Sequence, residues 1–217
     1  MNDGSDYIIG GRKAVPNEFP WMVRISGGCA ASYCAGSLIS PRVLLSSYHC
    51  TYHSKSKDKT VPCDHSDGKR KAYIGRHKFL KKESKSYYSI PIIDVLYPEP
   101  GNQVFSFTKD RSHDLALMIL KTPVTFSKTV CPICLPQRDQ EFGGVQAISA
   151  GWGQMRISKK PTQSRYLRKV SLKVDRKKYK HYKMIGTLLE IENGVYKDPC
   201  AGDSGMSNRQ IQLFKVT

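Results

Sequence analysis

The sequence contains no long hydrophobic run, no internal repeat and no low-complexity tract. A membrane-spanning helix needs about 20 consecutive, mostly apolar residues, so no membrane span is expected. Residues 1–7 have no basic region followed by an apolar run, and we do not interpret them as a signal peptide. The one C-x-x-C pair, Cys131 and Cys134, has no second pair at zinc-ribbon spacing. This argues against a zinc or redox centre, and no metal or cofactor is expected.

Acidic residues are also scarce. The chain has 18 Asp and Glu against 35 Lys and Arg, a net charge of +17. The excess is clustered in four runs, which are Lys55 to Lys59, Lys69 to Lys71, Arg76 to Lys85 and Arg176 to Lys183. Each run alone is typical of solvated loops, but together they predict affinity for polyanions. Because no base-reading motif or aromatic interleaving accompanies them, an anionic glycan is the expected partner and specific nucleic-acid binding is not.

The remaining composition indicates an all-β protein. Of the 217 residues, 39% are hydrophobic, and 17 Gly and 12 Pro separate short apolar runs such as residues 21–25, 37–39, 43–45 and 115–120. This pattern is typical of many short strands joined by turns. Residues 121–140, with three prolines, are predicted to form an extended connector, and the polar residues between Cys50 and Tyr73 a long surface loop. Seven cysteines favour disulfides and an oxidising, extracellular compartment.

The block from Asp198 to Gly205, Asp-Pro-Cys-Ala-Gly-Asp-Ser-Gly, is the strongest sign of chemistry. A serine hydroxyl is a weak nucleophile that needs a neighbouring base, itself oriented by a third group. Ser204 lies between glycines, which suits a tight turn. The backbone N–H groups of Gly202 and Ser204 are candidate oxyanion donors. A serine between glycines is more often a simple turn residue, but the Cys200 and Asp203 context favours the nucleophile.

Several segments, in order, resemble the trypsin/chymotrypsin-like serine endopeptidases. They are Ile8-Ile9-Gly10-Gly11, Phe19-Pro20-Trp21, Cys34 to Ile39, Ser46-Ser47-Tyr48-His49-Cys50, His113 to Met118, Cys134-Leu135-Pro136, Ala150 to Gly153 and the serine block. The resemblance covers Ile8 to Gly205. It implies two six-stranded Greek-key barrels, with a propeptide remnant at 1–7, a first barrel at about 8–120, a connector at 121–136 and a second barrel at 137–205.

The resemblance also implies a role for each matching residue. Ser204 is expected to attack the scissile carbonyl, His49 to take and return the proton, and Asp114 to orient the imidazole. Asp203 is expected to pair with the amino group freed at Ile8. Asp198 is expected at the floor of the specificity pocket, where it selects substrates with Arg or Lys. We interpret the other five histidines as surface or loop residues. They are His53, His65, His77, His113 and His181.

The resemblance pairs Cys34 with Cys50 and allows a further bridge between Cys29 and Cys63. Cys200 would pair with a cysteine that the sequence does not contain, and Cys134 with a propeptide cysteine. Tyr7 precedes Ile8 where the family has Arg or Lys, so activation by an Arg/Lys-specific cut is not expected there.

After Gly205, residues 206–217 do not resemble the family. Met206 stands where the family continues Gly-Gly-Pro, so the second barrel is expected to be truncated, with at most one replacement strand from the tail.

Three hypotheses follow from the sequence. The first is a secreted, monomeric endopeptidase that cleaves peptide bonds after Arg or Lys through an acyl-enzyme. The second is a catalytically impaired, protease-like module that binds polyanions or proteins. The third is an incomplete version of a full enzyme.

Overall fold

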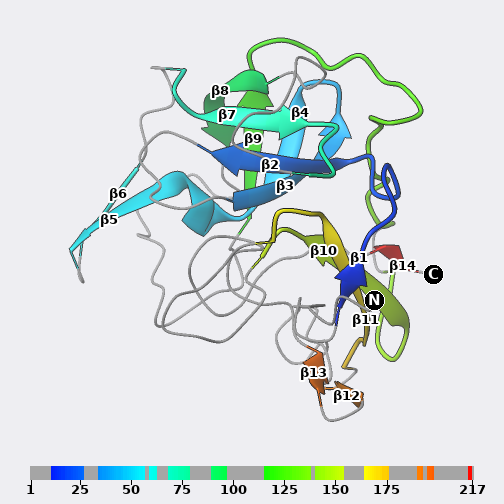
Figure 1. The fold of residues 1–217 in the computed structure, drawn as a ribbon. Helices are drawn as coiled ribbons and strands as arrows, with labels where there is room; N and C mark the ends of the chain where they lie inside the picture. The colour runs from blue at the N-terminus through cyan, green and yellow to red at the C-terminus, as the bar shows by residue number, and fades with distance from the viewer. Residues whose placement is uncertain are drawn as a thin grey trace. The chain divides into compact units, whose positions relative to one another are not determined.

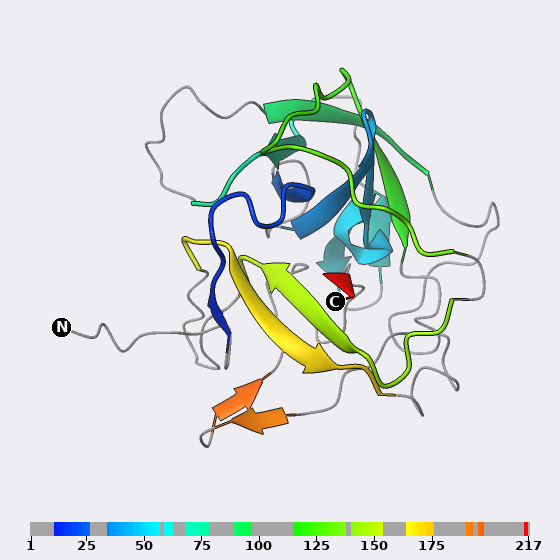
Figure 2. The same ribbon diagram turned by 90° about the vertical axis from the view of Figure 1, so that its right-hand side faces the viewer.

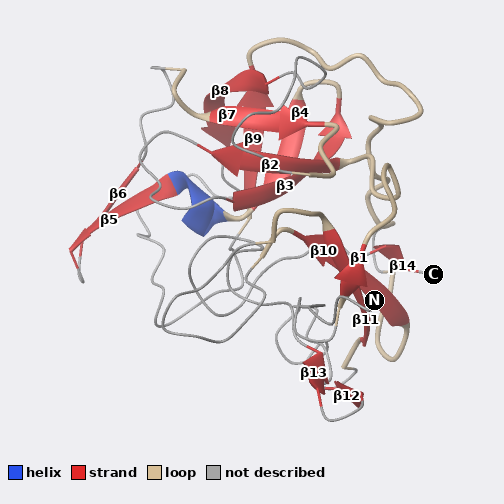
Figure 3. Cartoon of the chain, viewed as in Figure 1, coloured by secondary structure: helices blue, strands red, loops and turns tan. Residues whose placement is uncertain are grey.

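In the computed structural model, β-strands are nearly all of the regular secondary structure among the described residues. The structure describes residues 11–26, 34–56, 59–62, 68–78, 89–96, 115–137, 140–153, 164–175, 190–192, 195–197 and 215–216. In this part of the chain the one helix is the short 3₁₀ turn η1, Tyr48–Thr51, drawn in blue in Figure 3. No helix among these residues has the length and apolar character needed to cross a membrane. The all-β class predicted from the short apolar runs is confirmed.

The chain divides into two compact units. The barrel unit contains Phe19–Arg76 and Glu83–Leu135, and the sheet unit contains Met1–Glu18, His77–Lys82 and Pro136–Thr217. The chain therefore passes from one unit to the other four times. The sequence-based boundaries near residues 120 and 136 stay a prediction.

A closed antiparallel barrel forms the centre of the barrel unit (Figure 1). Its strands, in order around the barrel, are β2 (Met22–Ser26), β3 (Cys34–Ser40), β4 (Val43–Ser46), β9 (Ala116–Leu120), β8 (Ser89–Leu96) and β7 (Lys71–Ile74). Closure gives every strand two neighbours and removes sheet edges. The apolar runs at 21–25, 37–39, 43–45 and 115–120 all become strands here, as predicted.

Alternation of side chains fills the barrel interior. In β9, Ala116, Met118 and Leu120 are at most 1% exposed, whereas the residues between them are half-buried. Successive side chains of a strand point to opposite faces, so every second residue of β9 enters the core. The described core cluster contains Val23, Ile25, Cys34, Leu38, Leu44, Cys50, Ala72, Ile74, Ile90, Ile92, Met118, Leu120, Val124 and Val130.

The segment after β9 packs along the barrel. The N–H of Val124 donates to the carbonyl of Pro41 at 2.7 Å, and that of Ile133 to the carbonyl of Leu38 at 2.9 Å. Val124 and Val130 enter the barrel core. Gly75 accommodates this packing, because its φ of +70° and a 3.2 Å approach of Val130 leave no room for a side chain. The extended connector predicted at 121–140 is thus part of the barrel unit up to Leu135.

The predicted long loop after Cys50 contains a hairpin. Strand β5 (Tyr52–Ser56) pairs antiparallel with β6 (Lys59–Pro62). The prediction of a loop throughout was wrong, because the segment is polar and basic but still includes Tyr52, Thr60 and Val61, residue types that favour strands. Pairing also satisfies backbone groups that an irregular loop leaves to water.

The sheet unit contains a four-stranded sheet in the order β1 (Arg12–Lys13), β11 (Arg168–Lys173), β10 (Gln146–Gly151) and β14 (Lys215–Val216), seen in Figure 2. A separate hairpin joins β12 (Glu190–Glu192) and β13 (Val195–Lys197). Over the described residues the four-stranded sheet is open. Strand β14, from the tail, pairs with Ala147 and Ile148 of β10.

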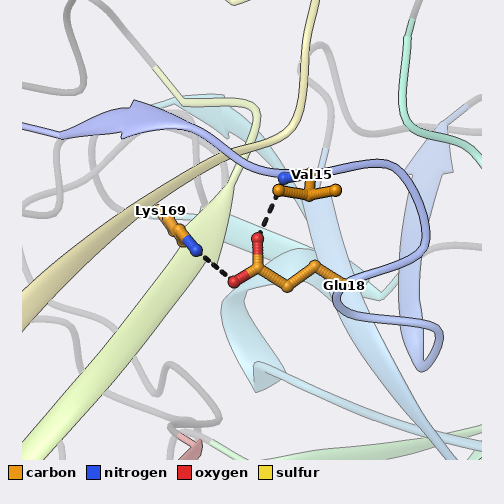
Figure 4. A network of polar contacts seen from close by, with 3 residues as sticks. All are labelled: Val15, Glu18 and Lys169. Carbon is orange, nitrogen blue, oxygen red and sulfur yellow. Dashed lines mark hydrogen bonds and ion pairs between the residues drawn. The ribbon is translucent and has the colours of Figure 1, made fainter.

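An ion pair fastens the N-terminal segment of the sheet unit to β11 (Figure 4). The Lys169 ammonium binds the Glu18 carboxylate, whose second oxygen accepts the N–H of Val15 at 2.9 Å. Burial raises the pKa of Glu18. The Lys169 hydrogen bond, the Val15 N–H and the charges of Lys169 and Arg12 outweigh burial and lower that pKa overall.

Candidate active site

His49 lies in η1, directly after β4. The turn is held by the N–H of Cys50, which donates to the carbonyl of Ser47 at 3.1 Å, and by Thr51 Oγ1, which donates to the carbonyl of Tyr48 at 2.6 Å. Cys50 and Thr51 are buried and His49 is half-buried. The backbone on both sides of the imidazole is therefore anchored while the ring keeps access to solvent.

A disulfide joins this turn to the barrel. Cys50 is bonded to Cys34, the first residue of β3, with an S–S distance of 2.09 Å and a Cα–Cα distance of 6.2 Å. Both sulfurs belong to the barrel core cluster. The covalent link fixes the residue next to His49 to the strand that begins at Cys34. Cys131 and Cys134, in contrast, carry free thiols, half-buried and exposed respectively.

Arg70 supports the same turn from the start of β7. Its side chain is 1% exposed, and its Nη2 donates to the carbonyl oxygen of Cys50. A buried guanidinium is costly unless it is hydrogen-bonded, and here its partner is the residue after His49. The interpretation of Arg70 as part of a solvated basic run was wrong for this residue. Alternation with buried Ala72 and Ile74 is the sequence signal that could have placed it inside.

The strand that follows Asp114 in the sequence begins beside the end of the strand that precedes His49. Ala116, the first residue of β9, pairs with Ser46, the last residue of β4. The structure thus brings together the described ends of the two segments that carry the predicted base and its orienting carboxylate. Asp114 lies outside the described residues, as do Ile8, Asp198, Gly202, Asp203, Ser204 and the predicted Cys29–Cys63 bridge.

His77 lies in a bend outside the strands, as predicted for a loop histidine. It is half-buried, and neither ring nitrogen has a hydrogen-bond partner among the described residues. Its ring lies 5.8 Å from the ring of Tyr166 between centroids. Burial and then the charge of Lys13 lower the pKa of His77. The two tryptophans are packing residues as expected, with Trp152 only 3% exposed and Trp21 packed on the barrel core.

In the described part of the chain, no group of three or more His, Cys, Asp or Glu residues is placed to hold a metal ion. A cavity in the barrel unit has a volume of about 550 Å³. It is lined by Ile74, Gly75, Ser89, Ile90, Thr122, Pro123, Thr125, Ser127, Thr129 and Val130. None of these residues is titratable, and the cavity does not include His49.

A closed antiparallel barrel with a disulfide-anchored histidine turn defines a class, the trypsin-like all-β fold. The family model described as Trypsin matches residues 8–207, nearly the whole chain. The chain therefore belongs to the trypsin family of serine proteases.

Curated relatives agree with this assignment. The chain is 27% identical to melanization protease 1 of Drosophila melanogaster over 92% of its own length and 53% of the relative's. It is 28% identical to kallikrein 1-related peptidase b24 of Mus musculus, covering 91% of this chain and 73% of that protein. Serine protease SSP1 of Scolopendra subspinipes is 30% identical over 68% of this chain and 48% of its own. The chain thus spans about half the length of two of these three relatives.

Solved structures share the fold. Human heparin binding protein superposes with a TM-score of 0.69 at 23% identity, covering 96% of this chain and 80% of that one. Neuropsin, a serine protease expressed in the limbic system of mouse brain, gives 0.64 at 21% identity, with 95% and 82% covered.

Proposed function

We propose that this chain is a serine endopeptidase that cleaves peptide bonds after Arg or Lys through an acyl-enzyme intermediate. Membership of the trypsin family supports the reaction class. The observation that carries the proposal is the anchored turn of His49, held by the Cys34–Cys50 disulfide and by Arg70, next to the start of β9. A general base has to be held in one geometry to accept a proton efficiently.

In the proposed mechanism, Ser204 Oγ attacks the scissile carbonyl and transfers its proton to His49. Asp114 holds the imidazole tautomer and stabilises the imidazolium. The N–H groups of Gly202 and Ser204 bind the oxyanion. His49 then protonates the leaving amine, and water hydrolyses the acyl-enzyme with His49 again acting as base.

Two further carboxylates complete the proposal. Asp198 binds the guanidinium or ammonium of the substrate residue before the cleaved bond, as a charge-assisted hydrogen bond. Asp203 pairs with the amino group of Ile8 once residues 1–7 are removed, and this pairing orders the oxyanion turn.

The test uses the chain cut before Ile8 and a fluorophosphonate probe that reacts with activated serines. We expect labelling of Ser204 and hydrolysis of an Arg-containing peptide, both lost in Ser204→Ala. The loss of kcat should be on the order of 10⁴-fold or more, because the nucleophile and base act as a unit. His49→Ala should therefore lose about as much kcat as the double variant Ser204→Ala/His49→Ala.

The control for specificity is Asp198→Gly. We expect it to reduce hydrolysis of Arg and Lys peptides about 100-fold or more while fluorophosphonate labelling persists, since labelling needs no basic side chain. If the wild-type protein is folded and cut before Ile8 but is not labelled, it is not a serine endopeptidase.

A second candidate is a protease-like polyanion-binding protein. The net charge of +17 supports it, and one of the structures that share its fold is named for heparin binding. Under this candidate, the family fold serves as a scaffold for basic side chains. Retention on a heparin column at 0.15 M salt, with no fluorophosphonate labelling, would favour it over the endopeptidase.

A further inference from the structure

Three short segments of the sheet unit form a backbone platform around Tyr166. The N–H of Ala14 donates to the carbonyl of Leu167 at 2.9 Å, and the N–H of Leu167 donates to the carbonyl of His77 at 2.7 Å. Lys78 forms an antiparallel bridge with Tyr166. These bonds fix the backbone next to Lys13, Lys78 and Tyr166, although the three segments are far apart in the sequence.

Two buried side chains hydrogen-bond to the backbone of this platform. The buried side chain of Ser164 donates to the carbonyl of Tyr166 at 2.7 Å and accepts its N–H at 3.2 Å. The indole N–H of the buried Trp152 donates to the carbonyl of His77 at 3.4 Å. Side chains carried by such a backbone have few ways to move apart except through their own rotamers.

Cationic side chains gather on this platform. Lys13 Nζ lies 3.7 Å and Lys78 Nζ 5.2 Å from the centroid of the Tyr166 ring. Arg165 is exposed and adjacent in the chain. We call Lys13, Lys78, Arg165 and Tyr166 the Tyr166 cluster.

The cluster has an excess of positive charge. Among the residues that the structure describes, no carboxylate forms an ion pair with Lys13, Lys78 or Arg165, and the Glu18 carboxylate binds Lys169 instead. The aromatic ring attracts both ammonium groups through its quadrupole but carries no net charge. Over the described ranges, these three formal charges therefore have no carboxylate partner.

Two neutral groups report the same positive potential. The Lys78 hydrogen bond, followed by the charges of Lys78, Lys13 and Arg165, lowers the pKa of the Tyr166 phenol against the opposing effect of burial. At His77, the charge of Lys13 adds to burial in lowering the pKa. An acid that ionises more readily indicates a place where an anion is favoured, whereas burial is the larger cause of the His77 shift.

We propose that the Tyr166 cluster binds a sulfate group of an anionic polysaccharide, with Lys13, Lys78 and Arg165 as its cationic contacts. This rests on the second proposed function and gives that function a site. Ammonium and guanidinium groups are the donors that bind sulfate oxygens by charge-assisted hydrogen bonds. The phenol of Tyr166 holds the two lysines at defined positions, which lowers the entropy lost when they bind.

A polysaccharide fits better than a nucleic acid. Proteins that bind single strands without sequence preference stack bases on free aromatic faces, whereas Lys13 covers a face of the Tyr166 ring at 3.7 Å. The chain also contains the Cys34–Cys50 disulfide, and disulfides persist in oxidising, mostly extracellular compartments, where sulfated glycans are the abundant polyanions.

The experiment measures binding of a heparin hexasaccharide to the full chain by calorimetry between 0.05 and 0.3 M salt. The test variant is Lys13→Ala/Lys78→Ala/Arg165→Ala. The matched control is Lys121→Ala/Lys128→Ala/Lys173→Ala, three exposed lysines outside the four basic runs that remove the same charge. We expect the test variant to lose at least tenfold in affinity at 0.15 M salt. Its slope of log K against log salt should fall in magnitude by roughly 3, one per lost contact, and the control should stay within threefold.

The failures can be told apart. If the wild-type chain does not bind the hexasaccharide, the polyanion-binding function is wrong. If it binds but both triple variants lose affinity equally, the charge is diffuse and the Tyr166 cluster is not the site. If a double-stranded DNA of equal charge binds as tightly and is lost in the same variant, the site does not select a sulfated glycan.

Variants of Tyr166 test the positioning of the lysines. Tyr166→Phe keeps the ring under both ammonium groups, and we expect affinity within about threefold of wild type. Tyr166→Leu removes the ring, and we expect a loss of about fivefold or more with Lys13, Lys78 and Arg165 all present. Equal affinities of the Phe and Leu variants would show that the ring does not position the cations.

Discussion

At the scale of single residues, Arg70 shows how the candidate active site depends on a side chain outside the catalytic motifs. Its guanidinium is buried and donates to the carbonyl of Cys50, directly after His49. Removing a donor from a buried acceptor leaves the acceptor with its full cost of desolvation. The arginine therefore supports the turn as well as filling space.

Arg70→Ala should destabilise the protein by about 2–4 kcal/mol, because it creates a cavity and removes the partner of a buried carbonyl. Arg70→Met fills most of the volume and should cost only about 1–2 kcal/mol from the lost hydrogen bond. Urea unfolding followed by fluorescence measures both. The exposed neighbour Lys71 is the control, since Lys71→Ala should change stability by less than about 0.5 kcal/mol. Similar losses in the alanine variants at 70 and 71 would contradict the buried role.

His77 predicts a pH dependence. Its folded pKa lies below the unfolded value of about 6.5. The unfolded chain therefore binds a proton that the folded chain resists, so this stability is present above about pH 6.5 and is lost as pH falls below it. Around His77, the ring of Tyr166 lies 5.8 Å away between centroids, Trp152 Nε1 donates to the His77 carbonyl, and Lys13 acts through its charge. In His77→Phe the fall in melting temperature between pH 7.5 and 5 should be smaller than in wild type. An unchanged fall would show that protonation of His77 does not cause the loss of stability.

At the scale of elements, the turn η1 is stabilised by a covalent bond to β3. The disulfide closes a loop with a sequence separation of 16 residues. Constraining the unfolded chain with a loop of that size is worth about 3 kcal/mol in the chain-entropy model. Most of this stabilisation acts on the barrel unit, where both cysteines lie.

Cys34→Ala/Cys50→Ala should therefore lower the free energy of unfolding by about 3 kcal/mol, and the reduced wild-type protein should show a comparable loss. Denaturant melts with and without reductant measure it. The free thiols offer a control, because Cys131→Ser/Cys134→Ser removes no disulfide and should leave the effect of reductant unchanged.

The ion pair between Glu18 and Lys169 ties the N-terminal segment to β11. Glu18→Gln keeps an acceptor for the N–H of Val15 but removes the charge, so we expect a loss of about 0.5–1 kcal/mol. The loss should shrink as pH falls below the unfolded Glu pKa value of about 4.3, because the pKa of folded Glu18 is lowered and the unfolded chain takes up the proton first. Thermal melts at pH 7 and pH 3.5 test this, and equal losses at the two values would show that the charge is not responsible.

The sequence predicted those elements whose signal is local. Apolar runs identified β2, β3, β4 and β9, because buried strands need consecutive or alternating apolar residues. The β5–β6 hairpin was missed because its composition is polar, and its pairing depends on backbone bonds. The order of the family motifs predicts His49 as the base, which stays a prediction, but the Tyr166 cluster joins Lys13, Lys78 and Tyr166. No local pattern relates residues so far apart.

At the scale of the whole molecule, the two units differ in core and in charge. Among the described residues, fourteen buried side chains form the barrel core cluster, whereas the buried apolar side chains of the sheet unit are seven, which are Ala14, Ala147, Trp152, Leu167, Val170, Leu172 and Val174. In the part of the chain that the structure describes, one carboxyl group (Glu18) and one imidazole (His77) have shifted pKa values, and both belong to the sheet unit. Acid should therefore weaken the sheet unit first.

Hydrogen exchange with mass spectrometry tests this difference. We expect lower protection factors in β10 and β11 than in β4 and β9 at pH 7.5, because fewer apolar contacts resist opening. Lowering the pH should reduce protection of the sheet unit below about pH 6.5 through His77 and again below about pH 4.3 through Glu18. Uniform protection of both units at every pH would contradict the prediction.

The pairing of β1 with β11 also has a consequence during synthesis. Arg12 pairs with Lys169, so the first strand leaves the ribosome long before its partner exists. At 5–20 residues per second, β1 has to wait about 8–30 s for β11. Its two residues, Arg12 and Lys13, are both charged, and charge on an unpaired strand hinders premature pairing with other chains. The barrel strands are complete by Leu120, so the barrel unit can fold while the N-terminal strand is still waiting.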